Sequence, residues 1–195
     1  MNTPSQESRA AEPGRGWLWL AFVWGFAEST FLFLVPDVLS SRLVLRRTRT
    51  GFAACGYSLA GALIGGLTLY LLGREPAVQR SMLLWADFVP GISPGLVEQA
   101  KGQLVAQGPA ALFAGFIGGI PYKLYAAQAA SAGLGVGTFL LASAVARLAR
   151  FLLVTTFAWL IGIILLPNLG VAAKLRIHTA GWILFYLCYF LWMGI

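Results

Sequence analysis

The sequence has few charged residues for its length of 195 residues. Asp, Glu, Lys and Arg make up 11% of the chain, whereas ordinary soluble domains contain about 25%. Hydrophobic residues make up 58%, which is more apolar surface than a soluble domain of this size can bury. This composition excludes an ordinary soluble domain and predicts a chain that crosses the lipid bilayer several times.

Cysteine and histidine are almost absent. Cys55 and Cys188 both lie in apolar segments, where cysteine behaves as a small hydrophobic residue, so no disulfide framework is expected. The single histidine, His178, lies in a basic loop, and we interpret it as an ordinary residue at the membrane surface. No H-E-x-x-H motif occurs, and the G-x-S-x-G match at 91–95 lies in a segment expected to form amphipathic helices, where no strand-to-helix nucleophile elbow is expected. We therefore expect no metal, no cofactor and no enzymatic activity.

Negative charge is scarcer than positive charge, with 7 acidic and 14 basic residues and a net charge of +7. Two loops, at 42–49 and 174–178, carry clustered cations, as cytoplasmic loops do under the positive-inside rule. We therefore expect lipid headgroups as partners, and no nucleic acid. The predicted location is a bacterial cytoplasmic (inner) membrane, which the chain crosses several times.

Long apolar runs organise residues 16–195 into one membrane domain. Residues 1–15 are polar with balanced charges, and they predict a disordered tail. Residues 74–108 mix charged and apolar positions at helical spacing, which predicts amphipathic helices on the membrane surface. Three apolar runs predict transmembrane helices, at 51–73, 136–166 and 180–195.

Two further apolar segments are interrupted by proline and by charge. Proline lacks a backbone donor and disfavours helix in the preceding residue. Paired interrupted segments indicate inverted repeats. The predicted fold is an all-α polytopic membrane protein with two re-entrant helical hairpins, at 16–50 (with its basic loop) and 109–132. Each hairpin precedes a transmembrane helix, and a C-terminal transmembrane helix follows. The residues expected to shape the hairpins are Pro36, Gly118, Gly119, Pro121 and Tyr122.

Five ionisable residues lie within the apolar regions: Glu28, Asp37, Lys123, Arg147 and Arg150. A charge at the bilayer centre costs about 2.5–3.5 kcal/mol on insertion scales, so such residues face a cavity or one another. Arg147 and Arg150 are three residues apart and share one helix face. Three cations against two carboxylates leave an excess of positive charge, which suits a phosphate group. We expect these five residues to form a binding or transport site.

Other roles remain open for the same residues. Glu28 can lock its hairpin, and Asp37 can cap a helix over residues 38–45. Arg147 and Arg150 can reach the membrane surface if the span begins only at Phe151. The glycine-rich face that includes Gly61 and Gly65 suits close helix packing, and glycine-rich faces suit a homodimer equally well.

Three stretches carry a family resemblance: FAESTFLFLVPDVLS, LAGALIGGLTLYLLGR and GFIGGIPYKLYAAQAASAGLGVGTFLLASAVARLARF. They resemble the DedA superfamily, also called the VTT or SNARE-associated family, and most closely its YqaA-like branch. The resemblance implies two re-entrant hairpins related by inverted symmetry. It also implies movement of phospholipids or polyprenyl phosphates between leaflets, or proton-dependent transport. Glu28 and Asp37 match the acidic residues that the family requires, and Lys123 takes the place of a hairpin arginine.

Three functions are therefore compared. The first is a transporter or scramblase that moves a phosphate-bearing lipid between leaflets, with a proton link through a titrating carboxylate. The second is a proton-coupled carrier of a small ion. The third is a membrane assembly factor that binds other membrane proteins without catalysis.

Overall fold

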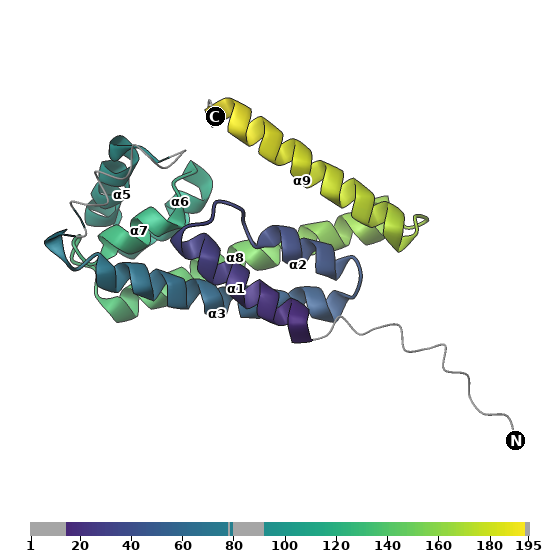
Figure 1. Ribbon diagram of the computed structural model, residues 1–195, viewed down its shortest axis with the longest axis horizontal. Helices are drawn as coiled ribbons and strands as arrows, with labels where there is room; N and C mark the ends of the chain where they lie inside the picture. The colour runs from purple at the N-terminus through teal and green to yellow at the C-terminus, as the bar shows by residue number, and fades with distance from the viewer. Residues whose placement is uncertain (1–14, 78, 80–91, 194–195) are drawn as a thin grey trace, which may run out of the picture.

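The computed structural model describes residues 15–77, 79 and 92–193, and these residues form helices and turns with no strand (Figure 1). The all-helical prediction is confirmed for this part of the chain. Of the expected N-terminal tail, Arg15 begins α1 and the rest lies outside the described residues. Parts of the expected surface segment, at 78 and 80–91, also lie outside them.

The first half of the chain is a helical hairpin followed by a long helix. In Figure 1, α2 turns back toward the side from which α1 came, and α3 then runs along α1. The turn lies at Thr30, whose hydroxyl bonds back to the carbonyls of the preceding helical turn, and at Pro36, which directly precedes α2. The elements are α1 (Arg15–Thr30), α2 (Asp37–Val44) and α3 (Thr48–Leu72).

The second half repeats this order. Gly119 ends α6 in the left-handed conformation, with φ of 75°, which glycine adopts without strain. Pro121 then precedes α7, so the hairpin turn occupies the expected Gly-Gly-Ile-Pro stretch. The elements are α5 (Pro94–Gln107), a 3-10 turn (Gly108–Ala110), α6 (Ala111–Gly118), α7 (Tyr122–Ala129) and α8 (Val136–Leu160), which continues into a π-helical turn (Ile161–Leu165).

The two hairpins enter from opposite ends of the molecule, and their turns meet in the middle (Figure 1). The helices α3 and α8 run past each other along its length. Among the described residues, these two helices are long and apolar enough to span a membrane, at Thr48–Leu72 and Val136–Leu165. The helix α8 is continuous through Arg147 and Arg150, so its apolar stretch begins well before Phe151.

The C-terminal helix α9 (Val171–Met193) stands apart from this bundle (Figure 1). It starts next to the π-helical turn and runs back across α2 toward the second hairpin. Five of its large apolar side chains are more than half exposed: Ile183, Leu184, Phe185, Leu187 and Leu191. The helix therefore presents one wide apolar face to its surroundings.

Glycines let α1 and α3 approach closely, as the sequence predicts for Gly61 and Gly65. A Cβ atom on Gly61 would overlap the backbone of Phe22 on α1, and one on Gly25 would overlap the backbone of Ser58 on α3. Close backbone approach through small residues is a common way to pack helices in membranes, where the hydrophobic effect contributes little between helices. The contact fixes α1, and with it the first hairpin, against α3.

Replacement of Gly61 by alanine tests this contact. We expect Gly61→Ala to lower the free energy of unfolding by about 1–3 kcal/mol, because the added methyl group meets backbone that cannot move aside. Gly56→Ala on the same helix is the matched control, since no atom lies within 4 Å of the added group. This control should be neutral or stabilising by up to about 1 kcal/mol. Equal thermal stability of the two variants in detergent would contradict the close contact.

Candidate functional site

Two ion pairs join the first hairpin to the middle of α8. Arg147 donates from Nη2 to Oε2 of Glu28, and Arg150 donates from Nη2 and Nε to Oδ2 of Asp37, at 2.5 and 3.1 Å. Asp37 is 1% exposed and Arg147 is 4% exposed, so the pairs lie inside the protein. The structure therefore brings together four of the five residues that the sequence singles out.

The local fold explains these positions. Glu28 lies in the last turn of α1, and Asp37 is the first residue of α2, directly after Pro36. Pro36 occupies the N-cap position and Asp37 already lies within the helix, so the alternative that Asp37 is the N-cap is wrong. Arg147 and Arg150 are one turn apart on α8, and this spacing matches the distance between the two arms of the hairpin.

Lys123, the fifth residue, connects the two hairpins. Its ammonium group donates to the carbonyl of Leu32 at 3.0 Å and lies 3.7 Å from the centre of the Phe33 ring. Leu32 and Phe33 belong to the turn of the first hairpin, and Lys123 follows the turn of the second. A buried cation with a carbonyl and an aromatic face as partners is stabilised without a carboxylate. The two halves of the chain therefore meet at this lysine.

The ring of Tyr122 packs against the guanidinium of Arg147. The Arg147 guanidinium lies 4.3 Å from the centre of the Tyr122 ring, and the Tyr122 hydroxyl donates to Ser143 at 3.1 Å. The position of Tyr122 at the start of α7, which Gly119 and Pro121 determine, thus positions a charged group on α8. The turn residues of the second hairpin therefore also determine where the Arg147 guanidinium lies.

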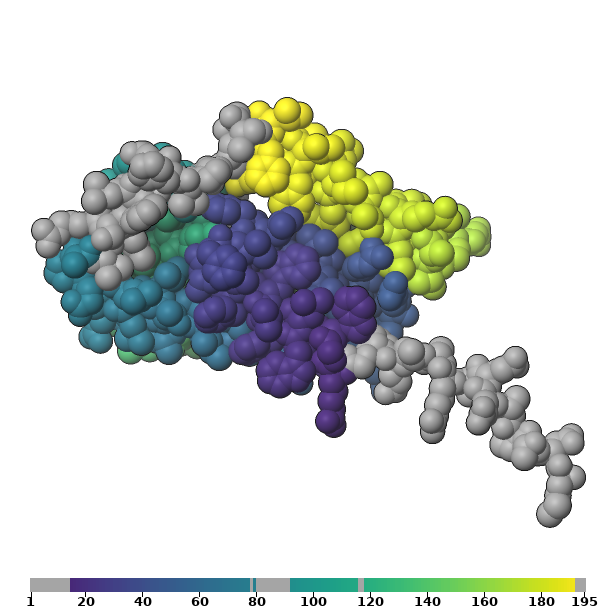
Figure 2. All heavy atoms as spheres, viewed as in Figure 1, coloured from purple at the N-terminus to yellow at the C-terminus, as the bar shows by residue number. Residues whose placement is uncertain are grey.

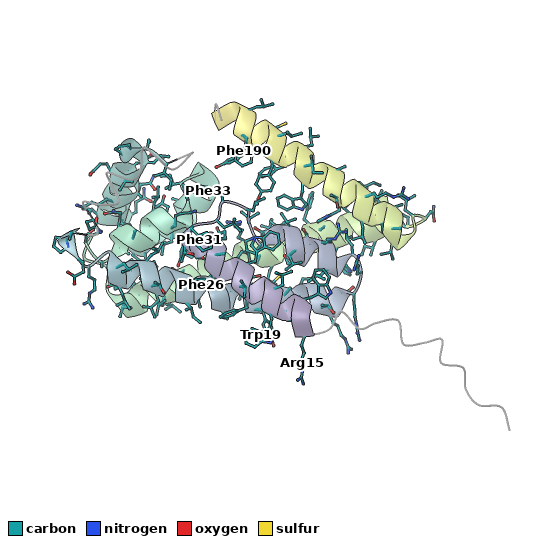
Figure 3. All side chains as sticks on the ribbon, in the orientation of Figure 1. Arg15, Trp19, Phe26, Phe31, Phe33 and Phe190 are labelled. Carbon is teal, nitrogen blue, oxygen red and sulfur yellow. The ribbon has the colours of Figure 1, made fainter. Side chains whose placement is uncertain are left out.

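The five charged residues line one cavity of about 610 Å³. The two hairpins and α8 form its polar side, and α9 forms an aromatic wall opposite. Figure 2 shows α9 as a separate ridge above the first hairpin, with a gap between them. Phe190 points from α9 toward the hairpins in Figure 3, and Phe33 lies at the first hairpin turn. The aromatic residues of the wall are Trp182, Phe185, Tyr186 and Tyr189.

Two buried polar atoms of this cluster have no hydrogen-bond partner among the described residues. They are Oδ1 of Asp37 and Nε of Arg147. A buried polar atom without a partner costs roughly 1–3 kcal/mol. Both residues line the cavity, but these two atoms are themselves enclosed by the protein, so a polar molecule in the cavity would reach them only after a side-chain movement.

The sequence did not identify the contribution of α9. His178, interpreted above as an ordinary residue at the membrane surface, lines the cavity with Ser41 and Trp182. Its Nε2 lies 2.8 Å from Ser41 Oγ and 3.1 Å from Trp182 Nε1. Tyr186 accepts a hydrogen bond from the backbone N–H of Val35 at 2.9 Å. The repeat of aromatic residues three and four positions apart on α9 is the signal that indicates this face.

Comparison with known proteins gives little further guidance. No protein-family model matches the chain, and no solved structure matches it. A protein of Haemophilus influenzae that is described only as uncharacterized is 29% identical over 169 residues. The match covers 84% of this chain and 81% of that protein. The site must therefore be interpreted from its own geometry.

A double-mutant cycle tests whether Glu28 and Arg147 are energetically coupled. Arg147→Gln should lower the free energy of unfolding by about 3–5 kcal/mol, because it leaves a buried carboxylate without its partner. Glu28→Gln/Arg147→Gln should cost less than Arg147→Gln alone, since it removes both charges together. Exposed Glu98→Gln on α5 should have no effect. Strictly additive effects in reversible unfolding would contradict the pairing.

Proposed function

We propose that the chain is a multi-pass protein of the bacterial inner membrane that moves a phosphate-bearing lipid between leaflets. The observation that carries this proposal is the cavity itself, which has a volume of about 610 Å³ and is lined by paired charges on one side and by an aromatic wall on the other. Such a site suits an amphiphile, because the headgroup can bind the charged side while the acyl chains lie along α9. The resemblance to the DedA superfamily implies the same class of substrate.

The size of the cavity favours a lipid headgroup over a small inorganic ion. Pockets for organic molecules usually enclose about 300–1,000 Å³, and this cavity lies within that range. A carrier for a small ion would be expected to enclose its cargo closely with several polar ligands. Most of this cavity is instead lined by apolar and aromatic side chains, notably Phe33, Phe157, Phe185 and Tyr189.

The proposed membrane placement follows from the apolar helices and the broken hairpins. The two long helices α3 and α8 span the bilayer, and α9 supplies a third span at 180–195. Each hairpin then enters and leaves the membrane by the same face, as re-entrant segments do, and the two hairpins use opposite faces. Non-helical backbone is tolerated at membrane depth where it lines a water-filled cavity, and the turn residues Leu32, Phe33, Gly119 and Pro121 line this one.

The phosphate would bind near Arg147 and Lys123. Arg147 has an unused donor at Nε, and Lys123 is the cation without a carboxylate partner in the interactions that the structure shows. A phosphate competes with Glu28 for the guanidinium, because both are anions that accept from the same donors. Protonation of Glu28 would release the guanidinium for the phosphate. This exchange links lipid binding to proton binding, and it requires no metal, cofactor or enzymatic step.

Lipid movement in proteoliposomes tests the proposal. The purified chain should accelerate transfer of fluorescent phospholipids, or of a polyprenyl phosphate, between leaflets, with and without a pH gradient. Glu28→Gln and Arg147→Lys should each reduce the rate at least tenfold while the protein stays folded. Arg46→Gln, an exposed residue of the basic loop, is the control and should keep the rate.

Two outcomes would replace the proposal. Proton-driven uptake of a small ion with no lipid movement would identify the chain as an ion carrier. Full folding with neither activity, together with stable capture of another membrane protein at the hairpins, would identify an assembly factor. Normal lipid movement by both site variants would show that the paired charges are only structural.

A further inference from the structure

Polar contacts attach α9 to the rest of the molecule. Leu175 is the buried apolar side chain among those described on this helix. The Lys174 ammonium donates to the carbonyl of Gly162 in the π-helical turn at 2.7 Å. Arg42 on α2 donates to Thr179 at 2.7 Å. Together with the contacts of His178 and Tyr186 described above, these bonds hold the aromatic wall over the cavity.

His178 is at the centre of this attachment. Its Nε2 lies within hydrogen-bond distance of Ser41 Oγ, and Trp182 Nε1 lies 3.1 Å from the same nitrogen and 3.3 Å from Ser41 Oγ. The Ser41 hydroxyl also makes a short contact with the carbonyl of Asp37. Three groups that can donate, Trp182 Nε1, the Ser41 hydroxyl and a ring nitrogen of His178, therefore meet between α2 and α9 and must share their acceptors.

One assignment of protons satisfies every donor in the group. The Ser41 hydroxyl donates to the carbonyl of Asp37 and accepts from both Trp182 Nε1 and His178 Nε2. A hydroxyl oxygen can accept two hydrogen bonds while it donates one. His178 is then neutral with its proton on Nε2. Its Nδ1 is an acceptor, buried and without a partner among the described residues, at the edge of the cavity.

We propose that His178 is a positioning residue whose protonation releases α9 from α2 and opens the cavity sideways to the membrane. A proton can bind only at Nδ1, where the described structure offers no acceptor for it. The resulting cation would lie near Arg42, which is also positive. The role of this opening as the lipid entrance rests on the function proposed above, whereas the release of α9 does not.

The direction of the pH effect follows from the surroundings of His178, which precedes the predicted span at 180–195. Burial lowers the pKa of His178 from 6.5 to about 4, and the Arg42 cation acts in the same direction. A lowered pKa means that the attached state is favoured above pH 6.5 and loses stability as the pH falls toward 4. Between pH 7 and pH 5, the ratio of released to attached α9 should rise about twentyfold.

Other charged groups near the attachment do not reverse this direction. On α2, Asp37 is paired with Arg150 of α8, and Arg42 is the cation that acts on His178. On α9, the Lys174 ammonium is bound to the carbonyl of Gly162. Tyr186 faces α2 through its hydroxyl and has no charge in this pH range. No carboxylate contacts His178 among the described residues, so protonation gains no ion pair in the attached state.

Distances between spin labels on α9 and α6 test the proposal in the full-length protein in lipid nanodiscs. Cys188 is exposed on α9, and Phe113 is 42% exposed on α6. The labels are placed on Cys188 and Phe113→Cys in a Cys55→Ser background. Acidification from pH 7 to pH 5 should increase a longer-distance population about twentyfold relative to the shorter one.

His178→Gln is the decisive variant, because its amide can reach the Nε2 position and bond to Ser41 but cannot take up a proton in this range. Its distances should stay in the attached form at both pH values. A pH response that persists in His178→Gln, a distance that shortens on acidification, or an unchanged distance in the unsubstituted protein would overturn the proposal. If α9 responds to pH but no lipid moves in proteoliposomes, the proposed function fails and the release of α9 stands.

Discussion

A buried charge in an apolar environment must have a partner, and this constraint organises the whole molecule. Glu28 and Asp37 lie on the two arms of a broken hairpin, and each is bound to an arginine near the middle of α8. Leaving either carboxylate alone would cost several kcal/mol. The hairpin cannot slide or rotate against α8 without breaking both pairs. The close glycine contact of α1 with α3 holds the same hairpin from its other side.

The second hairpin completes the site through one residue. Lys123 binds the carbonyl of Leu32 and the ring of Phe33. The two hairpin turns therefore meet where the backbone of each turn lacks helical hydrogen bonds. Free backbone carbonyls at a turn are natural acceptors for an ammonium group. The cluster of two ion pairs and one additional cation thereby has a net positive charge beside an aromatic wall, and the proposal of a phosphate-bearing substrate rests on this arrangement.

The sequence predicted the polar half of the site but not its other wall. Proline and glycine at the turns located both hairpins, because these residues act on their immediate neighbours. The cost of burying charge identified Glu28, Asp37, Lys123, Arg147 and Arg150 as mutual partners. The alternative roles for Asp37 and the arginines depended on which partner each side chain would reach, which only the packing decides. His178 was misjudged because α9 crosses α2, a contact between residues more than 130 positions apart that leaves no local pattern.

The most direct test of the account is an experimental structure of the protein in a lipid nanodisc. The account predicts a phospholipid with its phosphate within hydrogen-bond distance of Arg147 or Lys123 and its acyl chains along the aromatic face of α9. It also predicts that the ion pairs lie near the middle of the bilayer. A dry cavity sealed from lipid, with the pairs at headgroup depth, would contradict it.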